Sequence, residues 1–191
     1  MFLSHHHQFI FIHIHRTGGT TLVNLLRHEI GNKIHCISQH GNALSEEVEL
    51  LQKYPNYQVF SFVRNPWDRL LSWYALFHKW NPQNMETERK KIERFLENDD
   101  AIAVADGSFH YNQLDYLISH HRSIDDIKLF RFETFDASAK SLFEVLELPL
   151  FEIPILNNTT KKRYQDFFTK NSKALVAEKC EKDIAYFGYS F

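Results

Sequence analysis

The sequence predicts an α/β protein whose central, mainly parallel sheet is flanked by helices. Runs rich in β-branched and aromatic residues at 9–14, 57–63 and 127–132 predict strands, and segments with helical periodicity follow them. This alternation favours a parallel sheet, because a parallel connection needs a crossover segment. No repeat or linker interrupts the pattern, so we expect a single domain over residues 1–191.

The composition is that of a globular chain, since hydrophobic residues make up 43% of it and phenylalanine alone occurs 17 times. A net charge of −2 gives no electrostatic reason to expect a nucleic-acid partner. The two cysteines, Cys36 and Cys180, form no motif, and no run is long and apolar enough to span a bilayer. The first strand leaves no room for a signal peptide before it, so we expect a cytoplasmic protein.

Residues 9–22 predict an anion site. The strand-like run ends in a glycine-containing turn at 16–21, and apolar residues at helical spacing follow from Leu22. Amides at a helix start point into such a turn and attract anions. Gly18 and Gly19 would let the backbone approach the anion, and Arg16 adds a fixed positive charge. His13 and His15 share one face of the strand, with His15 bordering the turn.

The other elements follow from start and stop signals. We expect a short strand at 33–37, a helix from Ser45 to Pro55, and further helices at 85–98, 112–121, 137–146 and 172–185. Another helix begins at Pro66, because Asn65 is a good N-cap and proline suits the first helical position. Its apolar stripe predicts core packing and consists of Trp67, Leu70, Leu71, Tyr74 and Phe77.

Arg64 is not explained by packing. It stands directly after strand 57–63 and just before a helix start, at the place where open α/β sheets bind ligands. A nucleotide-hydrolysing or kinase P-loop would need a lysine before Thr20 and a metal-binding aspartate after the second core strand. The sequence has Gly19 and Arg64 at those places, so this interpretation fails on both counts.

The two motifs together resemble the sulfotransferases that use 3′-phosphoadenosine 5′-phosphosulfate (PAPS). The likeness is greatest to the carbohydrate branch that includes the heparan 2-O-sulfotransferases and small bacterial relatives. In this family a loop of the form Pro-Lys-Thr-(Gly/Ala)-(Gly/Ser)-Thr-Ser holds the 5′-phosphosulfate. The matching places are His15, Arg16, Thr17, Gly18, Gly19, Thr20 and Thr21. The family's second motif is an arginine at a strand end with a serine eight residues on, and it matches Arg64 and Ser72. The resemblance covers nearly the whole chain and implies a three-layer P-loop-like fold.

The resemblance implies a role for each matched residue. The loop would hold the phosphosulfate without a metal, and Arg64 and Ser72 would bind the 3′-phosphate. Arg16 stands where the family usually has lysine, so its charge is kept but its capacity to donate a proton differs. His15 stands where the family usually has proline.

A histidine is the expected general base for the acceptor hydroxyl. In the heparan-type relatives the base lies in the loop after the second strand, which implies His40 here. His35 is the rival, although its place within an apolar strand favours packing.

Three further matches are weaker. The basic run of Lys161, Lys162 and Arg163 lies where the family brings a late loop over the nucleotide, so one of them could touch the 3′-phosphate or all could be solvated. Trp67 could stack on adenine, although core packing is favoured, and Gln113 could face the acceptor.

The sequence therefore predicts a PAPS-dependent sulfotransferase acting on a hydroxyl, with a carbohydrate as the favoured acceptor. Two alternatives remain at this stage, a PAPS-binding module without turnover and a small-molecule kinase.

Overall fold

The computed structural model describes residues 1–41, 48–78, 83–104, 108–119, 122–149 and 163–191. The chain divides into two compact units. Unit 1 comprises Met1–Arg64 and Gln113–Ile155, and unit 2 comprises Asn65–Asn112 and Leu156–Phe191. Each unit is described separately below.

Unit 1 is built on the sheet. Its strands are β1 (Phe2–Ser4), β2 (Phe9–Ile12), β3 (His35–Cys36), β4 (Gln58–Val63) and β5 (Ile127–Arg131), in the spatial order β3-β1-β2-β4-β5. β2 pairs in parallel with β4, and β4 with β5, whereas β1 is antiparallel to both of its neighbours. Among the described strands, β1 is therefore the one reversed strand. The mixed α/β class with a mainly parallel sheet is confirmed.

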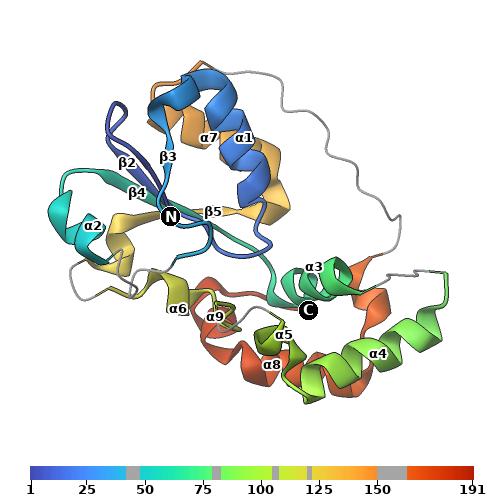
Figure 1. The fold of residues 1–191 in the computed structure, drawn as a ribbon. Coiled ribbons are helices and arrows are strands. Elements are labelled where there is room, and N and C mark those ends of the chain that lie inside the picture. Colours follow the sequence, from blue (N-terminus) through green and yellow to red (C-terminus); the bar gives the residue numbers. More distant parts are fainter. Residues whose placement is uncertain (42–47, 79–82, 105–107, 120–121, 150–162) are drawn as a thin grey trace. The chain divides into compact units, whose positions relative to one another are not determined.

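The helices of unit 1 flank this sheet. They are α1 (Gly19–Ile30), α2 (Val48–Lys53), α6 (Leu114–Leu117) and α7 (Phe135–Val145), with short 3₁₀ turns at Gly31–Lys33, Ile124–Asp126 and Phe132–Thr134. α1 and α7 lie together on one side of the strands (Figure 1). Alternate strand residues such as Phe9, Phe11 and Phe60 pack with Leu22 of α1 and Leu142 of α7. This period-two pattern lets one face of each strand form the core under both helices.

Unit 2 is helical. Its elements are α3 (Pro66–Phe77), α4 (Met85–Glu97), α5 (Asp100–Ala103), a 3₁₀ turn (Tyr164–Phe167), α8 (Lys170–Lys179) and α9 (Glu181–Phe187). Its core combines the stripe of α3 with apolar residues of α4 and α8, among them Trp67, Tyr74, Phe95 and Val176. Phe77 is the exception, because its side chain is largely exposed at the end of the stripe.

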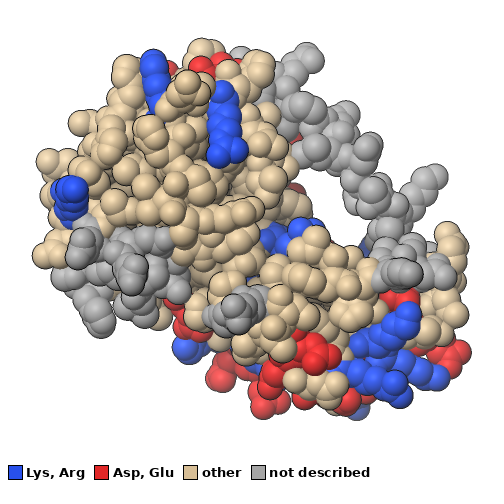
Figure 2. All heavy atoms as spheres, viewed as in Figure 1, with Lys and Arg blue, Asp and Glu red and all other residues tan. Residues whose placement is uncertain are grey.

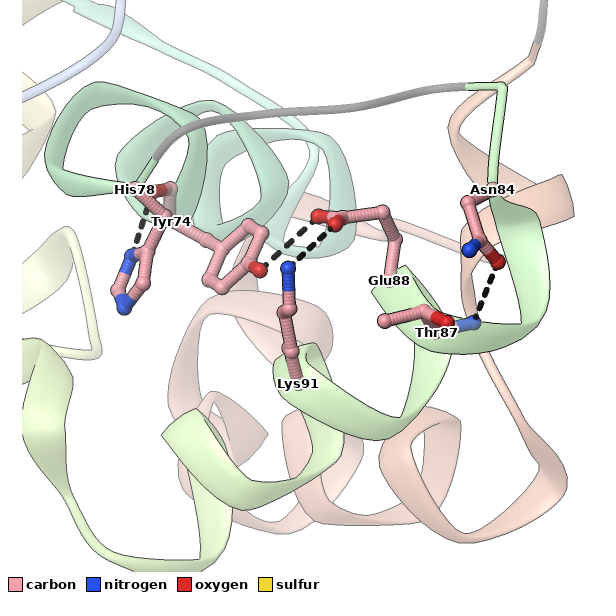
Figure 3. A network of polar contacts seen from close by, with 6 residues as sticks. All are labelled: Tyr74, His78, Asn84, Thr87, Glu88 and Lys91. Atoms are coloured by element: carbon pink, nitrogen blue, oxygen red, sulfur yellow. Dashed lines mark hydrogen bonds and ion pairs between the residues drawn. The ribbon is translucent and has the colours of Figure 1, made fainter.

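A hydrogen bond to a buried carboxylate joins α3 to α4 (Figure 3). The Glu88 carboxylate is 1% exposed, accepts a hydrogen bond from the Tyr74 hydroxyl at 3.0 Å and pairs with the Lys91 ammonium at 2.9 Å. Elsewhere on α4 the charges alternate in sign, and Figure 2 shows Lys and Arg side chains beside acidic ones over this helix. α4 therefore presents a mixed charged face rather than a basic patch.

Asn65 caps α3 as expected. Its side-chain oxygen accepts from the Trp67 amide at 3.1 Å, and Pro66 occupies the first turn. This cap begins the helix immediately after Arg64, because it satisfies a first-turn amide that lacks an intrahelical partner.

Three sequence expectations were wrong in detail, and one strand was not expected at all. β1 was missed, because its antiparallel partnership with β2 and β3 leaves little signal in three residues. The helix expected at 112–121 is only the single turn α6, and the one expected at 172–185 is divided into α8 and α9 at Cys180. The expected strand at 33–37 shortens to β3, whose two side chains are exposed. The start of the helix expected at Ser45 lies outside the described residues, which resume within α2.

In the part of the chain that the structure describes, no helix is long and apolar enough to cross a membrane.

Candidate active site

The turn between β2 and α1 has the geometry of an anion-binding loop. Gly18 is the N-cap of α1 and has a left-handed backbone with φ of 85°. The helical hydrogen-bond ladder starts with Leu22 N–H donating to Gly18 C=O at 3.1 Å, so the amides of Gly19, Thr20 and Thr21 precede it. These amides and the positive end of the helix dipole favour an anion at this end of α1.

The two glycines are required for different reasons. Gly18 supplies the positive φ. At Gly19 the reason is space, because an added Cβ would lie 2.0 Å from Cδ2 of the His13 ring. His13 is 2% exposed, so its ring has no room to move aside. The second glycine therefore serves close packing on His13, a role that the expected approach to an anion did not include.

The threonines of the loop also divide by role. The Thr17 hydroxyl is fully buried and donates to the Ile14 carbonyl at 2.9 Å. A hydroxyl has one proton to donate, so the Thr17 side chain closes the turn and leaves only its backbone amide as a donor to a ligand. Thr20 is exposed and Thr21 is half-buried at the start of α1, where their hydroxyls are accessible.

Arg16 and Arg64 meet at the loop. Arg16 has a positive φ of 65°, and its carbonyl accepts a hydrogen bond from Nη1 of Arg64 at 3.0 Å. The Arg64 guanidinium also lies over the Phe132 ring, 4.0 Å from its centroid. Burial and the neighbouring charge of Arg64 lower the pKa of Arg16. Two cations held this close in partial burial make the loop attractive to an anion of more than one charge.

Gln113 fixes the backbone of Arg64. Its Oε1 accepts from the Arg64 amide and its Nε2 donates to the Arg64 carbonyl, both at 2.8 Å. The side chain is completely buried. Gln113 is thus a structural clamp on Arg64, where the sequence had suggested a residue facing the acceptor.

His40 lies in a stack of imidazoles beside the loop. Its ring centroid is 3.7 Å from that of His15, with 21° between the planes, and 4.4 Å from that of His13. Nδ1 of His40 is 3.4 Å from the His13 carbonyl. A carbonyl only accepts, so this contact assigns the proton to Nδ1 and leaves Nε2 of the neutral ring as the lone-pair nitrogen.

Two histidines of the stack, His13 and His40, are held in the neutral form. Burial, with a smaller contribution from the neighbouring His40, lowers the pKa of His13 to about 3. Burial is also the main cause that lowers the pKa of His40, with Arg16 adding to it and the contact to the His13 carbonyl opposing it. A neutral His40 at pH 7 can accept a proton.

The remaining predicted site residues have different surroundings, each described within its own unit. His35 is exposed on β3, with its ring 6.4 Å from that of His5, so the expected packing role was wrong.

Ser72 lies half-buried on α3 of unit 2, and Arg163 is exposed in unit 2 beside Asp166 at 3.6 Å. Lys161 and Lys162 lie outside the described residues. Trp67 is buried and donates from Nε1 to the Lys173 carbonyl at 3.1 Å, as expected of a core residue.

Two participants had little or no sequence signal. Tyr116 is fully buried and shares a 2.9 Å hydrogen bond with Nδ1 of His15. Phe132, whose ring makes a cation–π contact with the Arg64 guanidinium, is the last residue of a predicted strand. Both come from chain segments far from the loop, so no local pattern could indicate them.

Among the described residues, no group of three His, Cys, Asp or Glu side chains is placed to hold a metal ion. A cavity of about 520 Å³ in unit 1 lies before the first residues of β4 and β5, and Pro55, Tyr57 and Arg122 line it. The loop after β2 and Arg64 after β4 belong to the other, carboxyl end of the strands.

Of the comparisons with known proteins, one found a match. The model of the sulfotransferase family matches residues 1–190. Searches of curated proteins and of solved structures each found no match. The match covers both motifs, the loop after β2 and Arg64 after β4, and it extends to the last helix. On this match over nearly its full length, the chain belongs to the sulfotransferase family.

Proposed function

We propose that the protein transfers a sulfuryl group from PAPS to a hydroxyl of a carbohydrate acceptor, with His40 as the general base. The observation that carries the proposal is the meeting of three groups at the start of α1: the cations Arg16 and Arg64 and the neutral imidazole of His40. The carbohydrate acceptor and the heparan 2-O-sulfotransferase-like branch rest on the sequence resemblance alone.

The donor set of the loop suits a phosphosulfate. Arg16 and the amides and hydroxyls of Thr20 and Thr21 would hold the 5′-phosphosulfate against the N-terminus of α1, with Thr17, Gly18 and Gly19 contributing backbone. Arg64 would bind the 3′-phosphate. Ser72 joins it in this role by sequence spacing, and Lys161 and Arg163 remain weaker predictions for the same phosphate.

The chemistry follows from charge and proton flow. PAPS supplies a sulfuryl group on a good leaving phosphate. His40 Nε2 would take the proton of the acceptor hydroxyl as its oxygen bonds to sulfur and the bond from sulfur to the phosphate oxygen breaks. Arg16 would stabilise the charge that develops on this leaving oxygen, and the step needs no metal.

The first experiment measures transfer of labelled sulfate from PAPS to a panel of carbohydrate acceptors, followed by identification of the labelled product. His40→Ala should lower kcat by about 10²–10⁴, the usual contribution of a general base. The affinity for the product nucleotide should stay unchanged. His35→Ala is the matched control, because it removes an exposed imidazole that precedes His40 by only a few residues. If His40→Ala keeps more than about a tenth of wild-type turnover, it is not the base.

The second experiment separates rate from binding at Arg16. Arg16→Ala should lower kcat by about 10²–10³, as for loss of one donor to a developing oxyanion, and Arg16→Lys should restore much of it. A normal kcat with a raised KM would show that Arg16 only anchors the nucleotide.

Two alternatives predict other results. A binding module without turnover would bind the 3′,5′-bisphosphate nucleotide and transfer nothing to any acceptor. A small-molecule kinase would need ATP and Mg²⁺. The proposal predicts instead that the bisphosphate nucleotide binds at least about tenfold more tightly than AMP, or about 1.4 kcal/mol.

The family match runs through both units, which supports the expectation of one functional domain over residues 1–191. A cytoplasmic location stays a prediction from the sequence.

A further inference from the structure

The His15 ring covers one face of His40. The 3.7 Å between their centroids is shorter than the 4.4 Å between His40 and His13, and the planes are nearly parallel. His15 is 4% exposed, so its own position is set by packing. On that side, the His15 ring prevents the His40 ring from tilting and keeps water away from it.

His40 has few restraints of its own. It is half-buried in the segment that follows the two-residue strand β3. Among the described residues its ring makes one hydrogen bond, to the His13 carbonyl, and at 3.4 Å this bond is weak. The face-to-face contact with His15 therefore restrains the plane of the ring more than this weak hydrogen bond does.

Tyr116 restrains His15 in turn. The hydroxyl of Tyr116 shares a 2.9 Å hydrogen bond with Nδ1 of His15, and both side chains are buried. The Tyr116 amide donates to the carbonyl of Gln113 at 3.1 Å, and the Gln113 side chain clamps Arg64. One short segment, from Gln113 to Tyr116, therefore holds both Arg64 and His15.

We propose that His15 and Tyr116 are positioning residues that hold the His40 imidazole in its plane and in its Nδ1–H tautomer, so that Nε2 faces the acceptor. The inference rests on the proposed function of His40. Neither His15 nor Tyr116 exchanges a proton with the substrate in this scheme. Their contribution is preorganisation, which keeps the base within the narrow geometry that proton transfer needs.

The charged and titratable groups that face His40 come from several elements. They are His13, His15 and Arg16 from the segment between β2 and α1, and the amino group of Met1, which precedes β1. Removing the His15 ring would admit water to His40, and the pKa of His40 would then rise towards the ordinary value of about 6.5.

The test compares three variants with a matched control. His15→Ala should lower kcat tenfold or more, and Tyr116→Phe should lower it about three- to tenfold, with product-nucleotide affinity unchanged in both. The double variant His15→Phe with Tyr116→Phe restores a flat ring beside His40 and removes both partners of the 2.9 Å hydrogen bond together, so kcat should return to within about threefold of wild type. Tyr57→Phe is the control, because Tyr57 makes the same 2.9 Å hydroxyl contact with His5, at the opposite end of β4 from Arg64.

A second measurement does not depend on turnover. Nitrogen-15 chemical shifts of the His40 imidazole should report the Nδ1–H tautomer in wild type. In His15→Ala they should report a mixture of tautomers and a pKa closer to 6.5. The same tautomer and pKa in His15→Ala as in wild type would overturn the inference whatever the activity.

The outcomes separate this inference from the proposed function. If His40→Ala abolishes transfer while His15→Ala and Tyr116→Phe keep wild-type kcat, His40 is the base and the positioning role is wrong. If His40→Ala keeps wild-type turnover, the proposed base is wrong, and the nitrogen-15 shifts alone decide whether His15 orders the His40 ring.

Discussion

At the scale of single residues, the site depends on side chains that fix one another in place. Arg64 is held by Gln113 through two backbone hydrogen bonds and by Phe132 through its guanidinium face. Its Nη1 in turn holds the carbonyl of Arg16, a residue in the left-handed region that non-glycine residues avoid. The loop is thus preformed by contacts within unit 1.

Gln113 should affect nucleotide binding without touching the nucleotide. Gln113→Leu leaves the amide and carbonyl of Arg64 without these partners, which costs about 1–3 kcal/mol per buried group. We expect the affinity for the 3′,5′-bisphosphate nucleotide to fall by about tenfold, measured by calorimetry, because the guanidinium is no longer held in one place. Gln52→Leu changes an exposed glutamine of α2 and is the control. Unchanged affinity in Gln113→Leu would show that the clamp does not matter for binding.

Gly19 should be intolerant of any side chain. Gly19→Ala places a methyl group against the His13 ring and should lower the free energy of unfolding by about 1–3 kcal/mol, as overpacking does. Urea denaturation measures the loss. In His13→Ala the space is empty, so adding Gly19→Ala to it should cost much less than in wild type. Equal costs in both backgrounds would mean that the His13 ring is not the obstacle.

At the scale of elements, the helices of unit 2 are joined by a buried carboxylate. Glu88 pairs with Lys91 on its own helix and accepts from Tyr74 on α3 (Figure 3). Burial and the neighbouring Glu88 raise the pKa of Tyr74 well above its ordinary value, so the hydroxyl stays a donor at any ordinary pH.

Glu88→Ala should destabilise the protein, because it leaves the Tyr74 hydroxyl buried without its acceptor. We expect a loss of about 1–3 kcal/mol in the free energy of unfolding, measured by urea denaturation. Glu86→Ala is the matched control, since Glu86 forms an exposed, solvent-screened ion pair with Lys90 on the same helix and should contribute much less than the buried carboxylate. If both variants lost a similar free energy of unfolding, burial of the Glu88 carboxylate would not be the reason for its contribution.

At the scale of the whole molecule, the buried histidines link folding to pH. Burial lowers the pKa of His13 to about 3, whereas an unfolded histidine has a pKa of about 6.5. Between these pH values the histidine of the unfolded chain binds a proton that the buried His13 does not. The free energy of unfolding is therefore highest above pH 6.5 and falls as the pH drops towards 3.

Wild type should therefore lose more stability on acidification than His13→Leu, which carries no titrating group there. Between pH 7 and pH 4 the difference should be on the order of 3 kcal/mol, because each unit of pKa shift corresponds to about 1.4 kcal/mol. Urea midpoints of both proteins at the two pH values measure it. Parallel losses in the two proteins would show that His13 takes up its proton without disturbing the fold.

Much of this architecture could be predicted from local sequence. The central strands β2, β4 and β5, the cap at Asn65 and the glycine turn before α1 each depend on neighbours within a few residues. Short elements could not be predicted in this way. β1 exists because β2 and β3 pair with it, and α6 is one turn long where its sequence favours a longer helix.

By itself the sequence determined the fold class, the loop after β2 and the placing of Arg64 at a strand end, because spacing along the chain specifies them. Only the tertiary structure decided which residues act on one another. His40 meets His15, Gln113 holds Arg64 and Tyr116 holds His15 across 25, 49 and 101 residues of sequence respectively. Contacts at such separations arise from the packing of the whole unit. The periodicity of the sequence indicates which face of an element is buried, but not which distant residue it meets.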